Sequence, residues 1–250
     1  MGNRFNSPSG AGGIAYMNWS GGKDSALCLY KAMALGKYKI KHLLTSVNAT
    51  HDRISMHGVR RSLLKAQAAS IGIPLTTIEL PEQPNMTEYE NAMLQKVNEL
   101  KQSGCTHAIF GDIFLEDLKT YREQKLGEAN IKCVFPLWKI NTTELVHEFI
   151  TLGFKSIIVC VNEQYLDKSF CGRVIDKDFI NDLPSNVDPC GENGEFHSFV
   201  YDGPIFKQPI DFIKGDIVYR TYAAPKNAED NCHSNTQPSA YGFYFCDLLP

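Results

Sequence analysis

The sequence predicts an α/β fold: a mostly parallel sheet in the first part of the chain, followed by a second, smaller α+β domain. Short apolar runs alternate with segments of helical periodicity through the first half, which is typical of a parallel sheet covered by helices on both faces. From residue 195 onward most segments have the pattern of strands. A chain of 250 residues is long enough for one large or two modest domains.

In the first half, predicted strands are followed by predicted helices. Residues 14–19 form an apolar run that suits a buried strand, and the segment after residue 25 has the mixed three- and four-residue apolar spacing of a helix. Gly72 and Gly104 follow two further helical segments and mark their ends. The other strands are predicted at 40–47, 75–80 and 108–110, and the other helices at about 58–71 and 88–103.

The pattern changes near residue 136. Helices are predicted at 141–152 and 176–183, and strands at 157–161, 196–201, 210–213 and 217–222. We therefore divide the chain into a flexible leader rich in Gly, Ser and Asn, a first domain, a second domain, and a polar tail that can add a last strand. Their boundaries are 1–13, 14–135, 136–225 and 226–250.

Composition is that of an ordinary soluble protein, with 43% hydrophobic and 21% charged residues. A net charge of −3 gives no general attraction for nucleic acid, so we do not expect a nucleic-acid partner. No apolar run approaches the ~20 residues that a membrane-spanning helix needs, and the N-terminus lacks the regions of a signal peptide. We expect a cytoplasmic protein with no membrane partner.

The most informative motif is the string SGGKDS at residues 20–25, between the first predicted strand and helix. Consecutive glycines permit positive φ and close approach of the backbone, and a helix N-terminus presents free amides to an anion. Lys23 adds a positive charge, while Ser20 and Ser25 add hydroxyl donors. The string lacks the glycine spacing of the common NTP-binding loop. A plain turn, with Asp24 as a helix cap, is the alternative.

Two other strand ends should meet this loop. The carboxyl ends of parallel strands lie along one rim of a sheet, and ligands bind there around the point where the strand order reverses. We therefore expect residues 46–48 and the pair Gly111 and Asp112 to lie beside the SGGKDS loop.

A second motif, GENGEFHS, occupies residues 191–198. Its glycines shape a tight loop, and the strand after it should project alternate side chains, including Glu195 and His197, to one face. Glu192 would then lie close to both. Such a group can hold magnesium, orient an amine nucleophile or accept its proton. The alternative interpretation is a polar hairpin with solvated acids.

Together, SGGKDS, His57-Gly58, Gly111-Asp112 and GENGEFHSF resemble the diphthine ammonia ligase (diphthamide synthetase) family and its wider N-type ATP pyrophosphatase superfamily. The resemblance extends from about residue 14 to 222. It implies a HUP-type nucleotide-binding domain and a smaller domain that helps to bind substrate. The characterised activity of the family forms the amide of diphthamide on translation elongation factor 2 from ATP and ammonium.

The resemblance also implies a reaction and its cofactors. ATP, with Mg²⁺, is cleaved to AMP and pyrophosphate, and adenylation converts an acceptor carboxylate into a mixed anhydride that ammonia or an amine can attack. The acceptor is a small molecule or a translation-factor protein. Lys23 and the loop amides would stabilise the charge on the leaving pyrophosphate, and Asp24 would bind Mg²⁺ directly or through water.

The residues that the resemblance implies at ATP and pyrophosphate are Ser20, Gly21, Gly22, Lys23, Asp24, Ser25, Ser46, Val47, Asn48, His57, Gly111 and Asp112. Those that we predict in catalysis or acceptor binding are Glu116, Tyr121, Arg122, Glu192, Glu195 and His197, of which the first three are chosen because they follow Gly111-Asp112 and can line the substrate entrance. Residues 46–48 would offer backbone groups to adenine. His57 can equally be a local hydrogen-bonding residue, and the segment 116–122 can equally be an exposed charged helix.

Two segments depart from the family pattern. Members that act on diphthine usually have Ser-(Glu/Asp)-Tyr-Gln after the glycine of the fourth strand, where this chain has LEDL at 115–118. They also tend to read GEGGE(Tyr/Phe)ET where this chain reads GENGEFHS. Both segments lie where the substrate should be recognised, so the departures concern the acceptor rather than ATP.

Two other functions fit the same motifs. A tRNA-modifying ATP pyrophosphatase would activate a base carbonyl and transfer sulfur or an amine, but the sequence shows neither a reactive cysteine pair nor a basic face. A nucleotide-sensing module would bind ATP without turnover, which the intact SGGKDS string and the acidic second motif disfavour. Nothing in the sequence indicates an oligomeric state.

Overall fold

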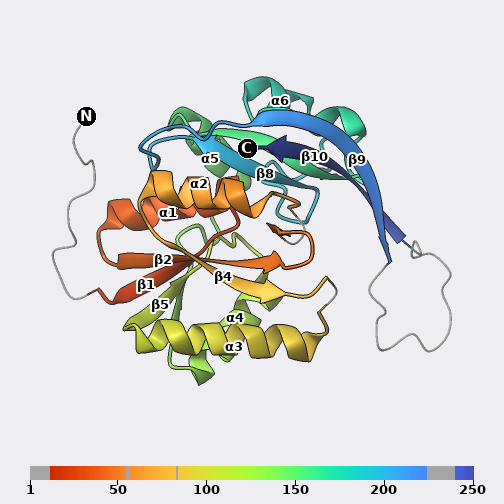
Figure 1. The fold of residues 1–250 in the computed structure, drawn as a ribbon. Helices are drawn as coiled ribbons and strands as arrows, with labels where there is room; N and C mark the ends of the chain where they lie inside the picture. Colours follow the sequence, from red (N-terminus) through yellow and green to blue (C-terminus); the bar gives the residue numbers. More distant parts are fainter. Residues whose placement is uncertain (1–11, 55–56, 83, 224–239) are drawn as a thin grey trace.

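The computed structural model describes residues 12–54, 57–82, 84–223 and 240–250. Two sheets organise these residues (Figure 1). The first is almost entirely parallel and the second is antiparallel, so the predicted α/β class with a second domain is confirmed. Most of the predicted leader and residues 226–239 of the predicted tail lie outside the described residues.

The first sheet places β1 at its centre, with β2 and β4 on one side and β5 and β6 on the other. The short β3 pairs antiparallel with the end of β2. The strands are β1 (Ile14–Asn18), β2 (Lys39–Asn48), β3 (Arg53–Ile54), β4 (Leu75–Leu80), β5 (Cys105–Ile109) and β6 (Lys132–Val134). Because the strand order reverses between β1 and β5, the loops that follow these two strands diverge and leave a crevice.

Helices cover both faces of this sheet. Figure 1 shows α1 and α2 between the first and second sheets, with α3 and α4 on the opposite face. Strand β1 is buried on both sides, since Met17 belongs to the core shared with the second sheet and Tyr16 to the core under α3 and α4. The helices are α1 (Lys23–Leu35), α2 (Arg61–Ile71), α3 (Met86–Gln102) and α4 (Glu116–Glu128).

The second sheet has the order β8-β7-β10-β9, with antiparallel neighbours. Its strands are β7 (Lys155–Asn162), β8 (Phe196–Asp202), β9 (Ile213–Ala223) and β10 (Ala240–Leu249), accompanied by α5 (Thr142–Thr151), α6 (Lys177–Asp182) and the short 3-10 helix η1 (Lys168–Phe170). The last strand, β10, is an interior strand between β7 and β9. In the described part of the chain, no helix is both long and apolar enough to cross a membrane.

Several predicted boundaries need correction, and the strand predicted at 108–110 is β5, which begins at Cys105. The helix predicted from residue 58 begins at Arg61, because Gly58 has a positive φ of 69°. Residues 53–54, which precede it, form the short strand β3. Residues 210–212 are not a strand, and β9 begins at Ile213 as one long strand. The helix predicted from residue 88 begins at Met86, because Asn85 and Glu88 form a capping box that fixes its start.

The C-terminal strand is held against the first sheet by a shared carboxylate. Asp247 in β10 accepts hydrogen bonds from Arg53 at 2.8 Å and from Arg60 at 2.6 Å. Gly58 lies against Phe245, because a Cβ at residue 58 would be only 3.0 Å from that ring. Strand β10 therefore fixes the turn that carries His57. Partial burial opposes the charge of Asp247, but the two guanidinium groups outweigh it and lower its pKa to about 2.

Asp247→Asn should lower the free energy of unfolding by about 1–2 kcal/mol at pH 7, after allowance for solvent screening. A lowered carboxyl pKa stabilises the fold above the ordinary pKa of Asp, and this stabilisation disappears as the pH falls toward about 2. The difference between wild type and variant should therefore shrink below about pH 4 in urea unfolding. Asp216→Asn, at an exposed position in β9, is the control. Equal losses in both variants would contradict the role of Asp247.

Candidate functional site

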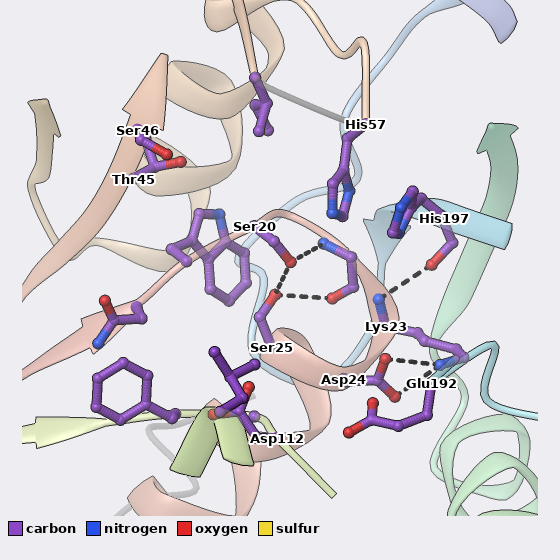
Figure 2. A pocket seen from close by; sticks show the side chains of 18 of the residues that line it. Ser20, Lys23, Asp24, Ser25, Thr45, Ser46, His57, Asp112, Glu192 and His197 are labelled. Carbon is purple, nitrogen blue, oxygen red and sulfur yellow. Dashed lines mark hydrogen bonds and ion pairs between the residues drawn. The ribbon is translucent and has the colours of Figure 1, made fainter. Parts of the chain in front are cut away.

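A cavity of about 550 Å³ opens at the crevice between β1 and β5, and both halves of the chain line it (Figure 2). The loop after β1 and the ends of β2 and β5 form one side, and residues 190–198 form the other. The predicted site residues that line the cavity are Ser20, Gly22, Lys23, Asp24, Ser25, Ser46, His57, Gly111, Asp112, Arg122, Glu192 and His197.

Three residues predicted at ATP lie outside the lining. Gly21 faces α2 and β8, to which its carbonyl is hydrogen-bonded. Val47 is fully buried between β3 and β4. The Asn48 side chain accepts hydrogen bonds from the backbone amides of residues 50 and 51, so it closes a turn.

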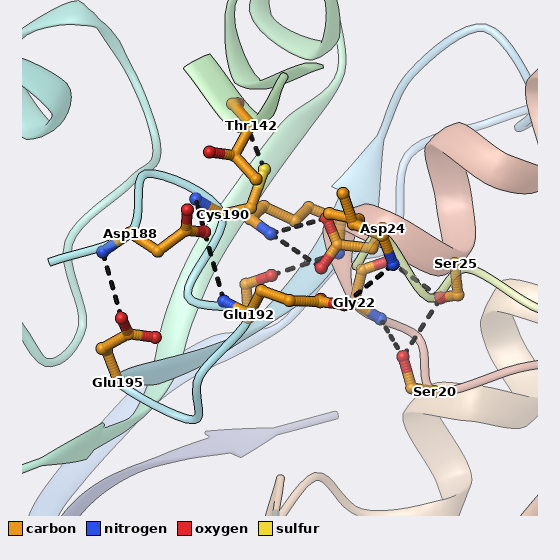
Figure 3. Close-up of polar contacts among 12 residues, drawn as sticks. Ser20, Gly22, Asp24, Ser25, Thr142, Asp188, Cys190, Glu192 and Glu195 are labelled. Carbon is orange, nitrogen blue, oxygen red and sulfur yellow. Dashed lines mark hydrogen bonds and ion pairs between the residues drawn. The ribbon is translucent and has the colours of Figure 1, made fainter. Parts of the chain in front are cut away.

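Three residues predicted at the acceptor also lie outside it. Glu116 and Tyr121 are on α4, where Glu116 pairs with Lys139 and the Tyr121 hydroxyl donates to Glu90. Glu195 is 1% exposed, and its carboxylate accepts hydrogen bonds from the amides of residues 188 and 193. Glu195 therefore does not converge with Glu192 and His197 as expected. The cause is local: the tight turn ends just before β8 begins at residue 196, and it directs this carboxylate back into its own loop (Figure 3).

A ring of hydrogen bonds shapes the SGGKDS loop. The Gly22 amide donates to the Ser20 hydroxyl at 3.3 Å, which donates to the Ser25 hydroxyl at 3.2 Å. The Ser25 hydroxyl in turn donates to the Gly22 carbonyl at 2.9 Å (Figure 3). Gly21 has a φ of 75°, a conformation that favours glycine. The loop is thus fixed before any ligand is bound.

Lys23 is a buried cation, 3% exposed, at the first position of α1. Its ammonium group lies 2.7 Å from both carboxylate oxygens of Asp24. Burial opposes the charge, but the carboxylate of Asp24 outweighs it and raises the pKa of Lys23 above its ordinary value. Its backbone amide donates to the Ser198 hydroxyl at 3.1 Å, which connects the loop directly to the second motif.

Gln67, a residue that the sequence analysis missed, joins the loop to the second sheet. Its side chain is fully buried and accepts from the Trp19 indole at 2.9 Å. Its amide group donates to the carbonyls of Gly21 at 3.0 Å and Val200 at 2.6 Å. The Val200 amide also donates to the Gly21 carbonyl at 2.9 Å. The sequence does contain a signal for this residue. Gln67 is a polar residue four positions after Leu63, so it lies on the apolar face of a predicted helix and indicates a buried hydrogen-bonding role.

Glu192 is the carboxylate that faces the loop from the second motif. It accepts from the Ile113 amide at 2.8 Å, so it also spans the two halves of the site. Burial, with a smaller contribution from the nearby charge of Asp24, raises the pKa of Glu192 to about 7. The group can therefore exchange a proton near neutral pH.

Asp112 and Arg122 form an ion pair at the end of β5. Their Oδ2 and Nε atoms are 2.8 Å apart, and the guanidinium group lies 4.4 Å from the centre of the Phe110 ring. This stacking orients Arg122 along the cavity wall.

An apolar wall, with residues from β2, β3, β4, α3 and α4 and from the segments after β1 and β5, was not predicted. It can receive a flat ring, because aromatic and aliphatic side chains surround a few polar groups there. Its members are Trp19, Leu44, Thr45, Ile54, Ile78, Tyr89, Met93, Phe110 and Leu118.

Two family models match this chain. The model described as the diphthamide synthase N-terminal domain matches residues 14–132, and the diphthamide synthase C-terminal domain matches residues 141–226. The chain belongs to the diphthamide synthase family. The family resemblance of the sequence motifs is thereby confirmed, and the two matches follow the first and second sheets in turn.

Curated relatives carry the name diphthine–ammonia ligase. The Bos taurus and Homo sapiens proteins are 26% and 25% identical to this chain, in each case over 80% of this chain and 82% of the relative. The Danio rerio protein is 22% identical over 76% of this chain and 83% of the relative. The similarity therefore extends through both halves of this member of the diphthamide synthase family.

Gln67→Leu should lower the free energy of unfolding of this diphthamide synthase family member by about 2–4 kcal/mol. The apolar side chain leaves the Trp19 indole and the Val200 carbonyl without their buried partner. Urea unfolding measures the effect. Gln124→Leu, at an exposed position in α4, is the matched control and should change stability by less than about 0.5 kcal/mol. A loss of similar size in both variants would show that Gln67 does not hold the loop.

Glu192→Gln should stabilise the protein, and the gain should increase with pH. A carboxyl whose folded pKa is raised to about 7 costs no stability while it is protonated in both states, and it destabilises the fold as it ionises. The variant should therefore match wild type near pH 4 and exceed it by about 1–2 kcal/mol at pH 8, after allowance for partial exposure. Urea unfolding across this range tests the sign. A variant that is less stable at pH 8 would contradict it.

Proposed function

We propose that the protein is an ATP-dependent ligase that forms AMP and pyrophosphate, adenylating a carboxylate for attack by ammonia or an amine. The observation that carries this proposal is the meeting of the SGGKDS loop and the second motif in one cavity, joined by the Lys23 amide and the Ser198 hydroxyl at 3.1 Å. The names of the relatives support a diphthine-type acceptor. An acceptor carboxylate on a translation factor or on a small molecule fits the same chemistry.

The nucleotide would place its base along the apolar wall and its phosphates against the loop. The N-terminus of α1 and the fixed loop backbone favour an anion there. Lys23 would stabilise the charge that develops on the leaving pyrophosphate, since a preorganised buried cation needs little reorganisation during the reaction.

Magnesium would be held mainly by the phosphates of ATP. Among the residues that the structure describes, no three His, Cys, Asp or Glu side chains form a metal cluster. One or two carboxylates are usual for protein-bound Mg²⁺ on a nucleotide, and Asp24 at the loop meets that need. When bound, the ion would neutralise charge on the transferring and leaving phosphates.

Glu192 would act on the nitrogen nucleophile. A carboxylate with a pKa of about 7 is suited to accept a proton from ammonium or an amine near neutral pH. Glu192 and Arg122 both line the cavity, and the charge of Arg122 favours an acceptor carboxylate.

The cysteine that lines the cavity argues against sulfur transfer. Burial raises the pKa of the Cys190 thiol to about 12, so it is not a thiolate at neutral pH. A module that senses ATP without turnover needs a phosphate site but no proton acceptor for a nucleophile. The presence of Glu192 in the cavity therefore favours an enzyme over a sensing module.

The direct test mixes protein, Mg-ATP and ammonium with candidate acceptors, including unmodified and diphthine-bearing elongation factor, and quantifies AMP, ADP and pyrophosphate. Acceptor-dependent AMP and pyrophosphate would support the ligase. ADP would overturn it, and tight ATP binding without turnover across the panel would favour the sensing module.

Lys23→Met should reduce acceptor-dependent AMP formation by about 10²- to 10³-fold, because it removes the buried cation that faces the leaving group. Lys31→Met is the matched control on the same helix, since Lys31 pairs with Glu148 away from the cavity. The control should retain the wild-type rate. A Lys23 variant that folds and turns over at the wild-type rate would exclude this role.

A further inference from the structure

Two stacked imidazoles, those of His57 and His197, line the cavity beside the SGGKDS loop (Figure 2). Their ring centres are 4.4 Å apart and their planes differ by 19°. His57 is carried by the turn that β10 fixes, and His197 belongs to β8. The fold therefore brings together two rings from distant parts of the sequence.

The pair lies at the phosphate end of the cavity. A Cβ at Gly22 would be 3.4 Å from Cε1 of His57, so this ring is directly against the loop backbone. His197 immediately precedes Ser198, whose hydroxyl binds the Lys23 amide. Both rings thus border the loop that we propose to hold pyrophosphate, and not the wall that contains Arg122.

Without an anion, both rings are neutral at pH 7. Burial lowers the pKa of His57 well below its ordinary value, and His197 and Lys23 lower it further. Burial and Lys23 lower the pKa of His197 to about 4. The neighbouring acids are already engaged, because Asp24 binds Lys23 and the Glu192 carboxylate binds the amide of residue 113.

His57 has an unused polar atom. Its Nδ1 is buried and has no hydrogen-bond partner among the described residues. Buried polar groups in native proteins are nearly always satisfied, so an unpaired ring nitrogen beside an anion loop indicates a place for a ligand atom.

We infer that the His57–His197 pair binds the pyrophosphate end of the nucleotide and takes up one proton when that anion enters. This inference rests on the proposed function. The negative charge of pyrophosphate outweighs the positive potential of Lys23, and it therefore favours the imidazolium form of the pair. The oxygens of pyrophosphate then accept a hydrogen bond from the newly protonated ring nitrogen. One proton is expected rather than two, because two stacked imidazolium rings would repel each other. The proton comes from solvent and returns to it when pyrophosphate leaves.

The test is ¹⁵N-histidine NMR of the full protein at pH 7.5, without magnesium, during titration with inorganic pyrophosphate. The ring nitrogens of the pair should change from neutral to imidazolium shifts by one proton in total. His57→Gln and His197→Gln assign the signals, and each should weaken pyrophosphate binding by about 10- to 100-fold. His147→Gln, at an exposed position in α5, should bind as wild type does.

The pH dependence gives an independent measurement. Pyrophosphate affinity should increase more steeply in wild type than in His197→Gln as the pH falls from 8 to 6, and this comparison cancels protonation of the ligand itself. Pyrophosphate binding with both rings still neutral, or with wild-type affinity in both Gln variants, would overturn the inference and leave the proposed function intact. Wild-type protein that binds no pyrophosphate and forms no AMP would overturn both.

Discussion

The site depends on one hydrogen-bonded junction, where the Gly21 carbonyl accepts from both the Gln67 side chain and the Val200 amide. This junction fixes the SGGKDS loop at the point where the first sheet, α2 and β8 meet. Because Gln67 is fully buried, water cannot replace its bonds without opening the core between the two sheets. The geometry of the loop is therefore a property of the packed molecule and not of the hexapeptide alone.

A second contact in the loop, the ion pair of Lys23 and Asp24, explains how a buried lysine remains charged. Lys23 can be buried because Asp24 follows it in the helix and lies 2.7 Å from its ammonium group. An isolated buried ammonium would lose its proton, whereas the carboxylate of Asp24 keeps Lys23 protonated beside the loop. Burial lowers the pKa of both His57 and His197, and the charge of Lys23 lowers it further.

Local sequence patterns were sufficient for the parallel sheet and for the loop. The apolar run at 14–19 corresponds to β1, which is buried on both faces, and the segments at 40–47 and 75–80, which also contain polar residues, correspond to β2 and β4. Side-chain direction was less predictable. Glu195 seemed equivalent to Glu192 in the string GENGEFHS, but a turn one residue before β8 directs it into its own loop. Likewise, the stacking of His57 on His197 depends on β10, which neither motif contains.

The departures from the family pattern lie in the cavity lining but outside the SGGKDS loop. The phosphate end is built from backbone, Lys23 and buried hydrogen bonds, which the family motif specifies closely. Leu118, in the segment LEDL, stands where the pattern has a glutamine and belongs to the apolar wall, and His197, beside the loop, stands where the pattern has a glutamate. An apolar group replaces an amide, and a neutral ring replaces a carboxylate. Each change alters the polarity of the cavity lining without altering the sequence of the loop, so the ligand that the cavity selects can diverge within this family while the loop is retained.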